Sequence, residues 1–95
     1  MNNRKQIIPN KLKEYRIKTG LTQIRVAKIF GFSTEERICH WEKGRSIPNL
    51  INLFRLSSLY GANPVELYPD LMKDTHVSIE TKLREIVFSF EPPQT

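Results

Sequence analysis

The chain has 95 residues, of which 39% are hydrophobic and 26% charged, a composition typical of one small globular domain and not of a disordered segment. The single cysteine, Cys39, excludes an internal disulfide and a cysteine-based zinc site, and it suits a reducing compartment. No apolar run is long enough for a signal peptide or a membrane-spanning helix. We therefore expect a cytoplasmic protein without membrane association.

The charge is unevenly distributed along the chain. Residues 1–60 carry twelve Lys and Arg against four acidic residues, a net charge of +8, whereas residues 61–95 carry three against six, a net charge of −3. A basic region attracts a polyanion, because neutralising phosphates releases condensed counterions. Charge alone also allows a solvated basic face that binds no partner.

Apolar spacing and helix-stop signals predict an all-α chain. A first helix is expected over residues 11–19, with Asn10 as its N-cap and Gly20 at its end. A second helix is expected from the N-cap Thr22 to Gly31.

A third helix is expected over residues 34–43. Ser33 and Glu36 are three positions apart, which is the spacing of a capping box at its start. Ile38 and Trp41 lie on one face and predict its buried side.

Two further helices are expected before residue 72. One follows the cap Asn49, and its predicted buried side consists of Leu50, Leu53, Leu56, Ser57 and Tyr60. The other is short, is capped by Asn63, and is limited by Pro69.

The C-terminal segment, residues 74–91, has the spacing of an amphipathic helix. Its apolar positions are Ile79, Leu83, Ile86, Val87 and Phe90. Pro92-Pro93 is expected to end it.

The chain contains, in this order, Gly20-Leu21-Thr22-Gln23, Val26-Ala27, Gly31, Ile38, Trp41-Glu42, Gly44 and Pro48. Their combined spacing resembles the helix-turn-helix of the phage repressor and Cro type, over about residues 10–70. The resemblance implies a compact five-helix domain, residues 10–72, after an N-terminal arm, residues 1–9, and before an extension, residues 73–95. It also implies that the third helix enters the major groove of double-stranded DNA.

The chain departs from that family at one point. Gly31 and Trp41 are ten positions apart, one more than in the common pattern. One residue is therefore inserted in the turn between Phe32 and Arg37, and roles transfer residue by residue from Arg37 onward.

The polar side of the predicted helix 34–43 carries the candidate base contacts. They are Thr34, Glu35, Glu36, Arg37 and His40. Arg37 is the favoured base reader, because its guanidinium matches O6 and N7 of guanine, and a phosphate contact is the alternative. Glu35 and Glu36 can accept from cytosine N4, or they act only in the first helical turn, where acids favour the helix dipole.

A second set of residues is expected to contact phosphates. Its members are Thr22, Gln23, Lys43, Arg45 and Asn49. In the family the helix N-terminus at Thr22 and Gln23 abuts a phosphate, and free backbone N–H groups there suit an anion. Lys43, Arg45 and Asn49 flank the loop after the third helix, where they would set register without reading bases. The alternative for each residue is an ordinary solvated side chain.

Arg16 and Glu42 resemble an ion pair by which the family ties its first helix to its third, with a role in orientation and not in chemistry. His40 and His76 are the only histidines, so no metal or other cofactor is expected. The sequence holds no glycine-rich phosphate loop and no nucleophile with an evident base, and we expect no enzyme activity.

Two functions follow as hypotheses. The first is a sequence-specific regulator, a repressor in the first instance, that binds a pseudo-palindrome as a homodimer, with residues 74–91 as its dimerisation element. The second is an antitoxin or another interaction module whose residues 74–91 bind a partner protein. For this segment, packing against its own domain is the third alternative.

Overall fold

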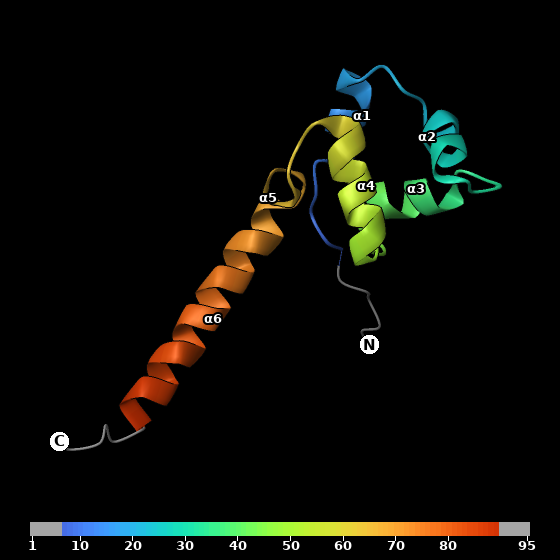
Figure 1. Ribbon diagram of the computed structural model, residues 1–95. Helices are drawn as coiled ribbons and strands as arrows, with labels where there is room; N and C mark the ends of the chain where they lie inside the picture. The colour runs from blue at the N-terminus through green and yellow to red at the C-terminus, as the bar shows by residue number, and fades with distance from the viewer. Residues whose placement is uncertain (1–6, 90–95) are drawn as a thin grey trace.

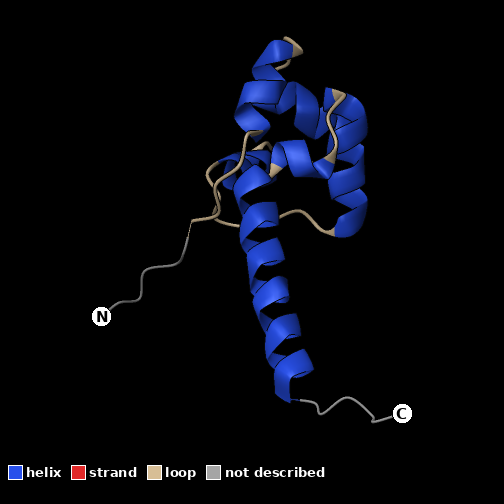
Figure 2. Cartoon of the chain, turned by 90° about the vertical axis from the view of Figure 1, so that its left-hand side faces the viewer, coloured by secondary structure: helices blue, strands red, loops and turns tan. Residues whose placement is uncertain are grey.

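The computed structural model describes residues 7–89, and within that range every regular element is an α-helix (Figures 1 and 2). The helices are α1 (Leu12–Lys18), α2 (Gln23–Phe30), α3 (Glu36–Glu42), α4 (Leu50–Tyr60), α5 (Pro64–Leu67) and α6 (Pro69–Ser89). The first five form a small domain from which α6 projects (Figure 1). This confirms the all-α class. The expected arm up to residue 6, Phe90 and the expected stop at Pro92-Pro93 lie outside the described residues.

Three helices begin at the predicted caps. The side-chain oxygens of Thr22 and Asn49 each accept a hydrogen bond from the backbone N–H three residues further on, at 3.1 and 2.8 Å. Asn63 and Glu66 form a complete capping box at the start of α5. Each cap satisfies an N–H group that the helix itself leaves unpaired, which is why these short helices begin where they do.

One apolar cluster joins α1 to α5. Its buried members are Leu12, Val26, Ala27, Phe30, Ile38, Trp41, Leu56, Tyr60, Ala62, Leu67 and Tyr68. On α4 the buried row is Asn52, Leu56 and Tyr60, spaced i, i+4, i+8. The prediction that Leu50 is buried is therefore wrong: position 50 falls off this row, and its side chain is 65% exposed.

The segment before α1 is bound to the end of α3. The backbone N–H of Ile8 donates to the carbonyl of Gly44 at 2.9 Å, and the amide of Asn10 donates to the carbonyl of Trp41 at 3.0 Å. A Cβ at Gly44, where φ is +74°, would lie only 2.4 Å from the Ile8 carbonyl oxygen. Gly44 is therefore required for both its backbone conformation and this close approach.

The last helix stands apart from the domain. It begins at Pro69, earlier than the expected residue 74, because proline fits the first position of a helix as well as it ends one. None of its residues is buried, and beyond its first turns, which line a groove with α5, the described part does not pack against its own domain (Figures 1 and 2). No helix within residues 7–89 has the length and hydropathy needed to cross a bilayer.

Two tyrosines anchor the domain at the junction of α4 and α5. Tyr60 and Tyr68 are each 6% exposed, and among the described residues neither hydroxyl has a hydrogen-bond partner. Burial raises the pKa of Tyr68 to about 12 and also raises the pKa of Tyr60, because a phenolate loses its hydration inside the core.

These tyrosines predict a loss of stability in alkali. A folded-state pKa above the unfolded value of about 10 means that the neutral form stabilises the fold below about pH 10, and that this contribution is lost as the pH rises toward about 12. Between these pH limits, the free energy of unfolding of the Tyr68→Phe variant should fall by about 2 kcal/mol less than that of the wild type. Urea unfolding at each pH measures the difference. An identical pH dependence of the two proteins would contradict the assignment.

Candidate nucleic-acid interface

The turn between α2 and α3 absorbs the extra residue. Gly31, at φ +82°, ends α2, and the next N–H, that of Phe32, donates back to the Ala27 carbonyl at 2.9 Å. The predicted capping box of α3 is wrong: Ser33 lies in the turn, and α3 begins only at Glu36, with no side-chain hydrogen bond from its cap residue. The residue that is extra relative to the common pattern therefore falls in the irregular turn and not within α3.

The buried side of α3 is held by aromatic packing. Ile38 and Trp41 are 1% and 4% exposed. The Trp41 ring meets Phe30 and Phe32 edge to face, with centroids 6.1 and 5.8 Å apart. Both phenylalanines flank the turn, so the same cluster fixes the turn and the roll of α3.

A carboxylate of α3 joins three helices. Glu42 accepts from Arg16 on α1 at 2.6 and 3.1 Å and from the Gln23 amide on α2 at 2.9 Å. The side chains of Arg16 and Glu42 are 11% and 4% exposed, and a third bond runs from the Arg16 guanidinium to the Leu21 carbonyl at 3.0 Å. The hydrogen bonds that Arg16 donates to the Glu42 carboxylate raise the pKa of Arg16 above its usual range. The expected ion pair is thus present, with Gln23 as an additional member.

The outward side of α3 is polar. Glu36 and His40, together with the C-cap residue Lys43, are spaced i, i+4, i+7 and form its outermost row, with His40 half-buried. Arg37 lies beside this row, and its guanidinium stacks on Phe32, 4.5 Å from the ring centroid. Thr34 and Glu35 are exposed in the turn before the helix. Thr34 lines a shallow polar hollow together with Arg37, and Glu35 lies outside this hollow.

The predicted phosphate contacts lie at the start of α2, where Gln23 reaches the last residue of α3, and in the segment that follows α3. The α2 N-terminus has no acidic residue in its first turn, although the Thr22 hydroxyl already caps it. Asn49 likewise caps α4 through its side-chain oxygen, which leaves its amide N–H groups for other acceptors. Lys43 and Arg45 are exposed just after α3.

A family model described as helix-turn-helix matches residues 12–67, more than half of the chain. The chain belongs to this helix-turn-helix family. The matched span runs from the first residue of α1 to the last residue of α5, so it coincides with the packed domain and leaves out α6. Among curated proteins and solved structures, nothing matches the chain.

Two residues of the helix-turn-helix domain escaped the sequence analysis. Phe32 supports both Trp41 and the guanidinium of Arg37. Arg55 of α4 donates to the Phe30 carbonyl at 2.9 Å and stacks on the Phe30 ring, and so it closes the C-terminus of α2. For Phe32, the only signal in the sequence is its position beside the turn glycine Gly31. For Arg55, no local sequence signal exists, because its partner lies on another helix.

The shared carboxylate predicts a specific pattern of stability. Glu42→Ala should destabilise the domain by about 3–5 kcal/mol, because it leaves the Arg16 guanidinium buried without its counter-charge. The double variant Arg16→Met/Glu42→Leu should recover much of that loss, since no charge stays buried. Urea unfolding of the three proteins measures both effects.

Glu85→Ala is the matched control. Its carboxylate pairs with Lys82 at 3.4 Å on exposed side chains, so its loss should change the free energy of unfolding by less than about 0.5 kcal/mol. Equal losses for Glu42→Ala and Glu85→Ala would contradict the joining role of Glu42.

Proposed function

We propose that the protein is a sequence-specific, double-stranded DNA-binding transcriptional regulator, and in the first instance a repressor, that inserts α3 into the major groove. The observation that carries this proposal is the two-sided character of α3. Ile38, Trp41 and Glu42 fix one side to the domain, which leaves the opposite polar side rigid and exposed. A helix held in this way fits a major groove about 12 Å wide.

Arg37 is proposed as the main base reader. Its guanidinium lies over the Phe32 ring, and so a planar donor fork is held at the edge of the exposed surface. Such a fork matches the O6 and N7 acceptors of guanine. The other proposed base contacts are Thr34, Glu35, Glu36 and His40. Glu36 and His40 belong to the outermost row of α3, which supports their inclusion.

The proposed phosphate contacts set affinity and register. Lys43 and Arg45 supply exposed charge beyond the end of α3, and Asn49 has amide N–H groups to donate. Thr22 and Gln23 present the N-terminus of α2, whose free N–H groups favour a phosphate. One N–H of the Gln23 amide is already bonded to Glu42. If the other N–H contacts a phosphate, DNA binding is coupled to the hydrogen bonds by which Glu42 joins α1, α2 and α3.

The net charge of +8 over residues 1–60 supports a polyanionic ligand of this domain. Occupying DNA in front of a promoter is sufficient to repress, and this requires no further domain. A pseudo-palindromic operator bound by a homodimer completes the proposal, with half-sites about 34 Å apart.

A second candidate is an interaction module of the antitoxin type. The observation that favours it is α6, a long helix with no buried residue and several half-exposed apolar side chains. In this role, a different protein would bind α6, and a second copy of this chain would not.

Two arginine variants separate base reading from phosphate binding. Arg37→Ala should relax the preference at one base pair by about 1–3 kcal/mol, because the bidentate contact is lost. Arg45→Ala should weaken binding to all sequences alike and reduce the salt slope of log K by about one. Sites selected in vitro from random DNA, followed by titrations at several salt concentrations, measure both quantities.

Arg84→Ala is the control for charge, since Arg84 is exposed on α6, away from α3. It should leave base preference unchanged. Equal affinity of the wild type for selected and random DNA would refute sequence-specific binding, and an unchanged base preference in Arg37→Ala would refute the role of Arg37.

A further inference from the structure

An apolar stripe runs along α6. Its positions Met72, His76, Ile79, Leu83 and Ile86 are spaced 4, 3, 4 and 3, which keeps them on one side of a helix that pairs with another helix. The four apolar members are between 47% and 61% exposed. Apolar surface of this extent on a helix outside the core marks an interaction site.

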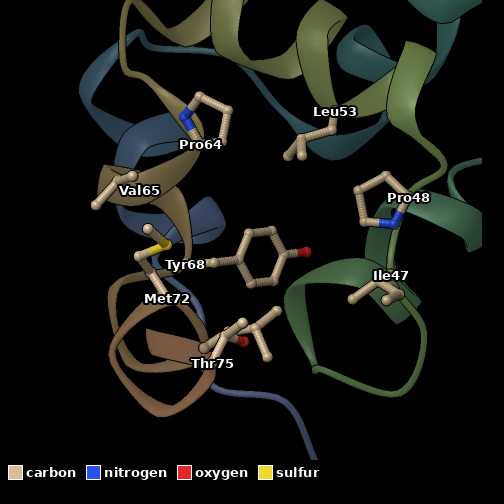
Figure 3. Close-up of a pocket in the computed structure, with 9 residues that line it drawn as sticks. Ile47, Pro48, Leu53, Pro64, Val65, Tyr68, Met72 and Thr75 are labelled. Atoms are coloured by element: carbon tan, nitrogen blue, oxygen red, sulfur yellow. The ribbon is translucent and has the colours of Figure 1, made fainter. Parts of the chain in front are cut away.

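The stripe leads into a groove at the base of α6. The groove has a volume of about 270 Å³ and lies between the loop before α4, α5 and the start of α6. Figure 3 shows Met72 and Val65 on one side of it, Ile47 and Pro48 on the other, and the Tyr68 ring between them. Because Met72 lines the groove and also begins the stripe, the two form one continuous surface.

We propose that this surface binds a second copy of the chain, with the two α6 helices paired antiparallel and the far end of each seated at the groove of the other. In the matching register, Met72 lies opposite Leu83 of the partner and His76 opposite Ile79. Ile86 then reaches the partner's position 69, beside the groove. The interface itself does not depend on DNA binding.

Charge on α6 favours a second copy as the occupant. The helix carries four acidic and three basic residues, a net charge of only −1, so two copies approach with little repulsion. In the antiparallel register Lys73 lies next to Glu80 of the partner, and symmetry repeats this pair. Parallel pairing offers no such pair, because Thr75 then faces Glu80 and Lys82 faces Val87.

Burial and long-range charge favour the same orientation. Parallel pairing would place His76 against its own copy within the seam, whereas antiparallel pairing places it against Ile79. Parallel pairing would also bring two domains of net charge +8 together at one end of the helix pair. Antiparallel pairing separates them and places the acidic part of each chain, with its net charge of −3, near the basic domain of the other.

The antiparallel pair also sets how far apart the two domains lie on an operator, and this part of the proposal rests on the proposed function. At a rise of about 1.5 Å per residue, the starts of the two α6 helices lie about 25 Å apart. The domains are attached at these two opposite ends, so the two copies of α3 are held apart, as binding to two half-sites about 34 Å apart requires.

The first test is the oligomeric state of the full chain without DNA, measured by sedimentation. The wild type should dimerise, and Ile79→Glu/Leu83→Glu should weaken the dimer at least 100-fold, because it buries charge in the seam. Both residues are exposed in the single chain, so the variant should still fold. Val77→Glu/Phe88→Glu is the matched control: both residues are exposed on other sides of α6, and dimerisation should persist.

A charge exchange tests the orientation. Lys73→Glu alone and Glu80→Lys alone should each weaken the dimer about three- to tenfold, and the double exchange should restore it. Val65→Glu in the groove should also weaken it, because the partner's far end packs there. If the double exchange does not restore binding, the proposed register is wrong.

A distance measurement closes the test. Ser89→Cys in a Cys39→Ala background gives one labelling site per chain, and pulsed electron paramagnetic resonance should report about 35 Å between the two labels. A distance below about 20 Å would indicate parallel helices, whose axes lie about 8–10 Å apart, and would overturn the orientation. A wild-type chain that stays monomeric up to high concentration overturns the dimer and favours a different protein as the occupant of α6. DNA affinity of the monomeric variant, measured separately, tests the proposed function on its own.

Discussion

The arrangement of the domain depends on a single carboxylate. Glu42 accepts hydrogen bonds from α1 and α2 while it sits at the end of α3, so the relative positions of three helices converge on one buried group. A buried ion pair contributes little net stability, because desolvating both charges offsets their attraction. Its directional bonds do restrict how α3 can roll and slide. That restriction is what a helix needs if its outer row is to meet base edges in a fixed register.

The inserted residue illustrates the same constraint. An extra residue within α3 would rotate everything after it by about 100° and separate Glu42 from its partners. Placed in the turn, it costs only some irregular backbone, which Gly31 and the Phe32 ring accommodate. In this chain the irregular backbone is confined to the turn, and the anchor, Ile38 to Glu42, keeps its packing against the core.

Much of the fold was predictable because its signals are local. Thr22, Asn49 and Asn63 cap helices through bonds to residues three positions away, and such spacing is visible in the sequence. The wrong predictions fall at positions where a local sequence signal is ambiguous or is overridden by tertiary packing. Ser33 has capping chemistry, but the packing of Phe32 keeps it in the turn. Proline at position 69 can stop one helix or start another, and the sequence pattern does not decide between them.

The candidate residues could be named from the sequence, whereas their contacts within the protein could not. Arg37 and Gln23 were identified from their positions, yet the structure adds a stacked ring to one and a carboxylate to the other. Both partners lie on other elements, so only the folded chain brings them together. Their effect is to reduce side-chain freedom before any DNA binds, which lowers the entropic cost of each contact. If two such domains are joined through α6, the second half-site is bound at high effective concentration, and modest contacts at each α3 suffice for tight binding.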